Sequence, residues 1–175
     1  MRTTIIATAT ALFIGGAGVL ALAVPASAAT TPVTVQVTGG ALGIGAPAGP
    51  VSLGTAAGSA SAQTVTGSLG PVLVTDLRAG IAGWVATAGS TDFTGSAGGT
   101  ISAGTLTYTP GTAVVVGIAT VTPITLTAMT TPGTVQTATA VLGVNTATWN
   151  PSIGVPIPAG AVAGTYSATI THSVS

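Results

Sequence analysis

The sequence has almost no charge. Its 175 residues include two basic side chains, two acidic ones, one histidine and no cysteine. Beyond Arg2, the acidic, basic and histidine side chains are Asp76, Arg78, Asp92 and His172. Acid–base and nucleophilic catalysis need several such groups held together at tuned pKa values, and a metal site needs several ligands. The composition therefore predicts a non-enzymatic protein without a cofactor or a metal site.

The missing charges and cysteines exclude other classes as well. Without disulfides, the hydrophobic core has to hold the fold of an exported chain. A formal net charge of zero argues against electrostatic capture of nucleic acid or of an anionic membrane surface. We therefore expect the function to depend on surface, shape and self-association.

Residues 1–28 have the pattern of a secretory signal peptide. Arg2 supplies the positive charge, an uncharged apolar run follows, and Pro25 interrupts the helix just before an A-x-A cleavage sequence at 26–28. The alternative is an uncleaved anchor, because the apolar run reaches the roughly 20 residues that span a bilayer. Small residues after a helix breaker favour cleavage. We expect a secreted domain, 29–175, that is free of the membrane.

The composition of this domain favours β-strands. Glycine and proline are frequent, threonine and valine are abundant, and the chain has neither lysine nor glutamate. Alternation of apolar and polar residues predicts strands at 33–38, 105–109, 124–128 and 166–174. The more uniformly apolar stretch 114–121 is interpreted as a central strand covered on both faces.

Turn residues separate these strands. Glycine and proline mark breaks at 39–40, 98–99, 110–111, 132–133 and 158–164. The Gly- and Ala-rich segment 43–70 is interpreted as long loops around short edge strands. Many short strands with turns between them predict an all-β fold, a single immunoglobulin-like β-sandwich of short antiparallel strands.

Two stretches resemble a known family. The first is Val74-Thr-Asp76-Leu-Arg78, followed by Gly83-Trp84 and by Ser90-Thr-Asp92-Phe93; the second is Gly164-Thr-Tyr166-Ser-Ala-Thr-Ile170-Thr-His172-Ser-Val174. They resemble the central stretch and the second motif of the WxL-domain family of Gram-positive cell-surface proteins. The resemblance implies a secreted β-sandwich that attaches non-covalently to peptidoglycan. Where the family has Trp-x-Leu, this chain has Trp84-Val85-Ala86 and His172-Ser173-Val174.

The resemblance makes Trp84, Tyr166 and His172 candidate binding residues for a wall glycan. An exposed tryptophan suits a sugar ring, because its flat face is apolar and its N–H donates a hydrogen bond. The alternative is packing. Trp84 shares a strand face with Ala86, and Tyr166 and His172 share one with other apolar residues, so each also fits a core position.

Asp76, Arg78 and Asp92 are the charged residues of the expected domain. Asp76 and Arg78 lie two positions apart and thus on one face of a strand, where they are expected to form a structural ion pair. Alternatively Arg78 meets Asp92 across strands, or a carboxylate caps a turn. A glycosidase would need the two carboxylates at a defined separation beside a sugar-binding cleft, which no motif indicates.

These observations predict a secreted, non-enzymatic bacterial surface protein that associates non-covalently with peptidoglycan or another wall glycan. The alternative is a self-assembling structural subunit of a surface layer or fibre. In natural sheets, lysine or inward-pointing charges on the edge strands prevent pairing with other chains, and this chain has no lysine. A net charge near zero also weakens colloidal repulsion.

Overall fold

The computed structural model describes residues 30–175. Residues 37–175 form one compact β domain, whereas residues 30–36 belong to a separate unit of the chain. The predicted signal peptide and its cleavage sequence lie outside the described residues. Within 30–175, no helix is long and apolar enough to cross a membrane.

The β domain contains strands of two to 17 residues and one turn of 3-10 helix. In chain order they are β1 (Leu42–Gly45), β2 (Gln63–Ser68), β3 (Val72–Asp76), β4 (Trp84–Ser90), β5 (Phe93–Gly95), β6 (Thr100–Ile101), η1 (Ala103–Thr105), β7 (Thr107–Thr109), β8 (Val114–Pro123), β9 (Gly133–Trp149), β10 (Ser152–Ile157), β11 (Tyr166–Ser167) and β12 (Ile170–Val174). All the strand pairs are antiparallel. The predicted all-β fold of short antiparallel strands is confirmed.

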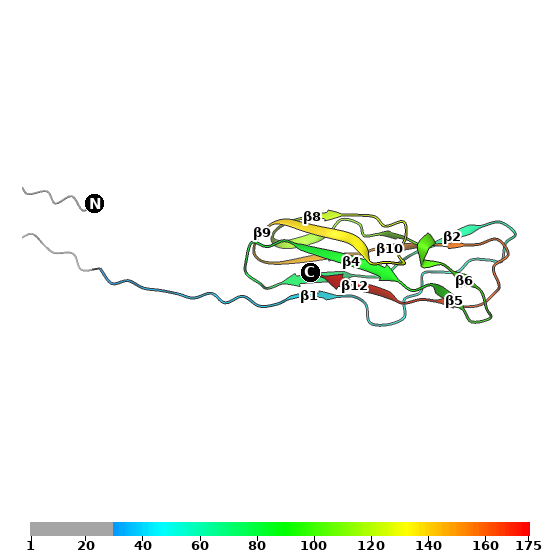
Figure 1. The fold of residues 1–175 in the computed structure, drawn as a ribbon, viewed down its shortest axis with the longest axis horizontal. Coiled ribbons are helices and arrows are strands. Elements are labelled where there is room, and N and C mark those ends of the chain that lie inside the picture. The colour runs from blue at the N-terminus through cyan, green and yellow to red at the C-terminus, as the bar shows by residue number, and fades with distance from the viewer. Residues whose placement is uncertain (1–29) are drawn as a thin grey trace, which may run out of the picture. The chain divides into compact units, whose positions relative to one another are not determined.

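The largest sheet has six strands. Its order is β1-β3-β9-β4-β12, and β8 pairs with β9 as well. β9 turns back at the left end of the domain in Figure 1, so its second half pairs with β3 and its first half with β4. Ala140 and Gly143 have positive φ at this turn. The sheet thereby curls until β1 and β12 lie beside each other, which nearly closes it.

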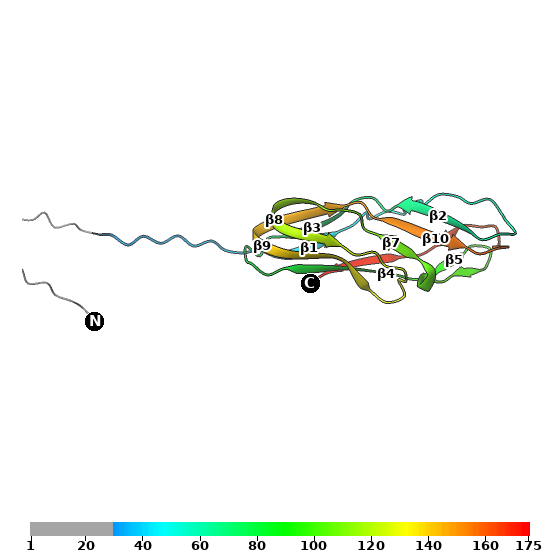
Figure 2. The same cartoon turned by 90° about the horizontal axis from the view of Figure 1, so that it is seen from above.

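Two smaller sheets occupy the other end of the domain. β10 lies between β2 and β7, and β5 lies between β11 and β6 (Figures 1 and 2). β10 follows directly from β9 and carries the chain into this end. The curled sheet and the smaller sheets enclose one core, whose largest fully buried side chains include Trp84, Trp149, Tyr108 and Leu106.

The predicted strands are found in part. The C-terminal stretch forms β11 and β12, with Tyr166, Ile170 and His172 on the partly buried face, and β7 covers 107–109. The predicted strand at 124–128 is wrong, because only an isolated bridge joins Leu126 to Tyr108. Its alternating pattern falls in the connection between two long strands.

Two other predictions fail in an informative way. Residues 33–38 alternate like a strand but have no strand assignment, and Val33, Val35 and Val37 are exposed. The stretch 114–121 forms β8, which is not a covered central strand: among the described residues β9 is the strand that pairs with it, and its outer side chains are exposed. Apolar composition did not distinguish a covered strand from an exposed edge.

Candidate functional site

Two of the three charged residues of the domain, Asp76 and Arg78, form a partly buried network at the end of β3. Asp76 is 1% exposed and accepts two hydrogen bonds of 2.9 Å from the Arg78 guanidinium, from Nε to Oδ1 and from Nη2 to Oδ2. Arg78 also donates to the carbonyl oxygens of Ala82 and Gly83. The backbone amide of Arg78 donates to Asp76 Oδ1, which is the geometry of a local Asx turn. The network fixes the loop between β3 and β4.

The same network reaches the indole of Trp84. Asn145 on β9 donates from Nδ2 to Asp76 Oδ2 at 3.4 Å and accepts from Trp84 Nε1 at 3.2 Å. Trp84 is 2% exposed. Its ring is therefore packed in the core and its N–H is already bonded, which leaves no free face for a sugar. The structure assigns Trp84 a packing position.

A second buried network joins β7, β9 and β12. Trp149 Nε1 donates to Tyr108 Oη at 3.2 Å, and Tyr108 Oη lies 3.0 Å from His172 Nε2. The Tyr108 and His172 rings meet edge to face, with centroids 5.7 Å apart. Burial raises the pKa of Tyr108 to about 12, although the hydrogen bond from Trp149 acts against this rise. These contacts tie the C-terminal strand to the core.

Acid is expected to destabilise the domain in two stages. Burial lowers the pKa of His172, so stability is lost as the pH falls below the unfolded value of about 6.5. The hydrogen bonds from Arg78 hold the pKa of Asp76 below its usual value, so its contribution is present above about pH 4 and is lost as the pH falls through the folded pKa. Thermal melts between about pH 8 and pH 3 measure both losses of stability, because this range includes the usual pKa values of histidine and aspartate. In His172→Gln the loss of stability below about pH 6.5 is expected to disappear. If this loss persists in the variant, it does not come from His172.

Tyr166 lies apart from the other two candidate binding residues. It is on β11, its hydroxyl donates to the Val162 carbonyl oxygen at 3.0 Å, and its ring lies over Gly95 and Gly99. The structure therefore places Trp84, Tyr166 and His172 in three different environments and does not bring them together as one binding surface.

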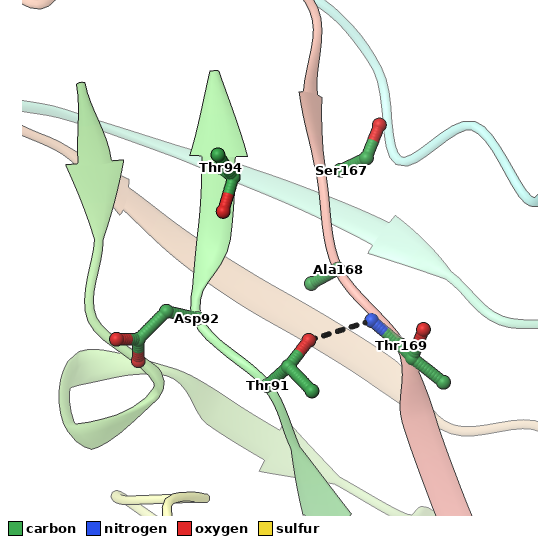
Figure 3. Close-up of a pocket in the computed structure, with 6 residues that line it drawn as sticks. All are labelled: Thr91, Asp92, Thr94, Ser167, Ala168 and Thr169. Carbon is green, nitrogen blue, oxygen red and sulfur yellow. Dashed lines mark hydrogen bonds between the residues drawn. The ribbon is translucent and has the colours of Figure 1, made fainter. Parts of the chain in front are cut away.

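Asp92 lies at a shallow hollow of about 400 Å³ beside β5 and β11. Figure 3 shows its lining, which is made of Thr91, Asp92, Thr94, Ser167, Ala168 and Thr169. Thr91 Oγ1 accepts from the Thr169 amide at 3.0 Å, and Asp92 Oδ1 accepts from the Ala103 amide at 2.7 Å. Asp92 thus holds the turn of η1 and is not paired with Arg78. The hollow offers hydroxyl groups but its lining contains no aromatic ring.

The outer face of β8 and β9 carries a group of exposed apolar side chains. Its side chains Val114, Val116, Ile118, Leu142 and Val144 are between 53% and 73% exposed. We call the unpaired side of β8, together with Val114, Val116 and Ile118, the β8 edge. Within residues 30–175, no second strand pairs with it. Backbone groups on this side are therefore available for a further strand.

Sequence reasoning missed three buried polar residues. Asn145, Gln136 and Tyr108 are all buried, and each donates or accepts a hydrogen bond in the interior. One signal was available for Asn145, because asparagine is depleted in strands and here directly follows the uncharged apolar run 141–144. Among the described residues, no group of three His, Cys, Asp or Glu side chains could hold a metal ion.

Comparison with protein-family models, with curated proteins and with solved structures gave no match.

Proposed function

We propose that the chain is a secreted, non-enzymatic structural protein of the bacterial surface that self-associates through the β8 edge. The observation that carries the proposal is this edge: β8 is ten residues long, and β9 covers one side of it. A free strand edge presents amide and carbonyl groups in the spacing that another strand needs.

The side chains of the β8 edge favour association. Val114 is 73% exposed, Val116 is 68% exposed and Ile118 is 57% exposed. Burying them removes apolar area from water, at about 25 cal/mol per Å². No charged residue lies on β8 and the whole chain has no lysine, so the edge lacks the charges by which natural sheets prevent such pairing.

A lysine on the edge is expected to block the association. We expect light scattering of the processed chain to show larger species as concentration rises, with little effect of salt because few ions are involved. Val116→Lys places a charge beside the edge and is expected to stay monomeric. Val162→Lys is the matched control. Val162 is also exposed and lies between β10 and β11, and its replacement by lysine changes the net charge by the same amount. Equal scattering by both variants would contradict the proposal.

Association with a wall glycan is the second candidate function. Two observations favour it: the resemblance to WxL domains, and the hydroxyl-lined hollow beside Asp92, which can exchange hydrogen bonds with a hydroxylated ligand. The same two lysine variants separate the candidates. Wall binding by single domains predicts that Val116→Lys sediments with insoluble peptidoglycan as the unmodified chain does. If Val116→Lys loses both assembly and sedimentation with peptidoglycan, the result favours self-association over wall binding by single domains.

A further inference from the structure

We propose that residues 31–38 of one copy add as a strand to the β8 edge of the next copy, which links the molecules head to tail. This inference rests on the proposed function, because it names the partner that the β8 edge accepts. The donor is a segment of the same chain, and the acceptor is β8.

The donor segment has the sequence of a strand but not the pairing of one. Val33, Val35 and Val37 alternate with Thr34, Gln36 and Thr38, yet the valines are 88%, 91% and 81% exposed. Residues 30–41 have no strand assignment in the described structure. A segment of β-branched residues with one apolar face gains most from pairing when a sheet edge is available.

The end of the donor is fixed to its own domain. The amide of Gly40 donates to the Leu77 carbonyl oxygen. A side chain at Gly39 would collide with the backbone of Arg78, and one at Gly40 would collide with Leu77 Cβ. Both positions therefore suit glycine, and they connect the segment to β1. In the sheet order, β3 and β9 separate β1, to which this attachment leads, from β8 of the same copy.

The acceptor matches the donor in length, pattern and charge. Val114 and Val116 alternate along the outer face of β8 as the valines alternate along the donor, and the exposed Ile118 follows after the register shift at Gly117. Placed side by side, the two sets form cross-strand pairs of β-branched residues, which stabilise a sheet. Neither partner carries a charge that pairing would bury.

Because donor and acceptor are different surfaces, the contact is heterologous. Each copy has one donor and one acceptor, so repeated head-to-tail contacts extend into a chain of molecules unless the rotation between copies closes a ring. This separates the proposal from β8-to-β8 pairing, which would use the same edge twice.

Two charge variants and their mixture test the proposal. Val35→Glu removes the donor and keeps the acceptor, whereas Val116→Glu removes the acceptor and keeps the donor. Each variant of the processed chain is expected to be monomeric in sedimentation velocity, and an equimolar mixture is expected to give one heterodimer and nothing larger. Val162→Glu, which lies outside both surfaces, should assemble like the unmodified chain. Val114→Glu serves as the acceptor variant if Val116→Glu changes the thermal melt.

The other outcomes overturn the proposal in distinguishable ways. If the unmodified chain is monomeric at every concentration, the proposed function and the inference fail together. If Val35→Glu still assembles while Val116→Glu does not, the β8 edge is the interface but residues 31–38 are not its partner. The mixture contains one variant with an intact donor and one with an intact acceptor. If it stays monomeric, residues 31–38 do not pair with the β8 edge of another copy.

Discussion

Replacing Trp84 by alanine is expected to lower the free energy of unfolding by about 3–5 kcal/mol. Trp84 is 2% exposed, lies on β4 in the curled sheet and bonds to Asn145 through its indole N–H. Truncation leaves a large cavity and removes the hydrogen bond that links the core to the Asp76 network. Denaturant unfolding followed by circular dichroism measures the loss.

Trp84→Phe is the matched control, because it keeps most of the ring volume and removes only the N–H. Its expected loss is smaller than that of Trp84→Ala, on the order of one unmade buried hydrogen bond, about 1–3 kcal/mol. A glycan contact would behave differently. An alanine variant that melts like the unmodified chain but no longer sediments with peptidoglycan would contradict the packing assignment and support the role that the WxL resemblance implies.

Gly117→Ala is expected to have the second large effect. Gly117 has φ of +92° where the register between β8 and β9 shifts, and a Cβ there would lie 2.5 Å from the Val144 carbonyl oxygen. Alanine therefore meets both a disfavoured backbone conformation and a backbone clash. A residue forced into such a conformation costs about 1–3 kcal/mol, and the clash adds to this cost. Thermal and denaturant melts measure the change.

Two other glycines separate the two causes. Gly143 has φ of +72° but open space around its missing side chain, so Gly143→Ala tests the backbone conformation alone. Gly43 on β1 has neither a positive φ nor a close neighbour, so Gly43→Ala is expected to leave stability unchanged or slightly raised. Equal losses for Gly117→Ala and Gly143→Ala would show that the clash contributes nothing.

The strand content was predictable because it depends on local pattern. Alternation along 166–174 gave the correct inward face, and the Gly and Pro pairs ended strands where the structure ends them, as at Pro110 and Gly111 between β7 and β8. These features depend on neighbouring residues alone. The all-β class followed from them.

The arrangement of the strands was not predictable in the same way. The stretch 114–121 is apolar enough for a covered strand, but whether another strand lies beside it depends on how β9 turns back. Residues 33–38 show the opposite case: they have the alternating pattern of a strand but are not paired in the described structure. Pairing partners are a property of the whole fold.

The candidate site shows the same limit. The spacing of Asp76 and Arg78 indicated an ion pair, which the structure contains at 2.9 Å. Sequence spacing did not show that Asn145, more than sixty positions away, completes the network to Trp84. The resemblance drew attention to Trp84, Tyr166 and His172, but only the fold shows that these three side chains do not share a surface.

Hydrogen exchange at low and high protein concentration tests most directly whether the chain assembles through the β8 edge. The β8 amides that face away from β9 are expected to exchange rapidly in dilute protein and to become protected at high concentration, as are the amides of residues 31–38. The amides of β10, which lies between β2 and β7, are expected to exchange equally under both conditions and serve as the internal reference. Identical exchange across 114–118 at both concentrations would contradict the assignment of this edge as the assembly surface.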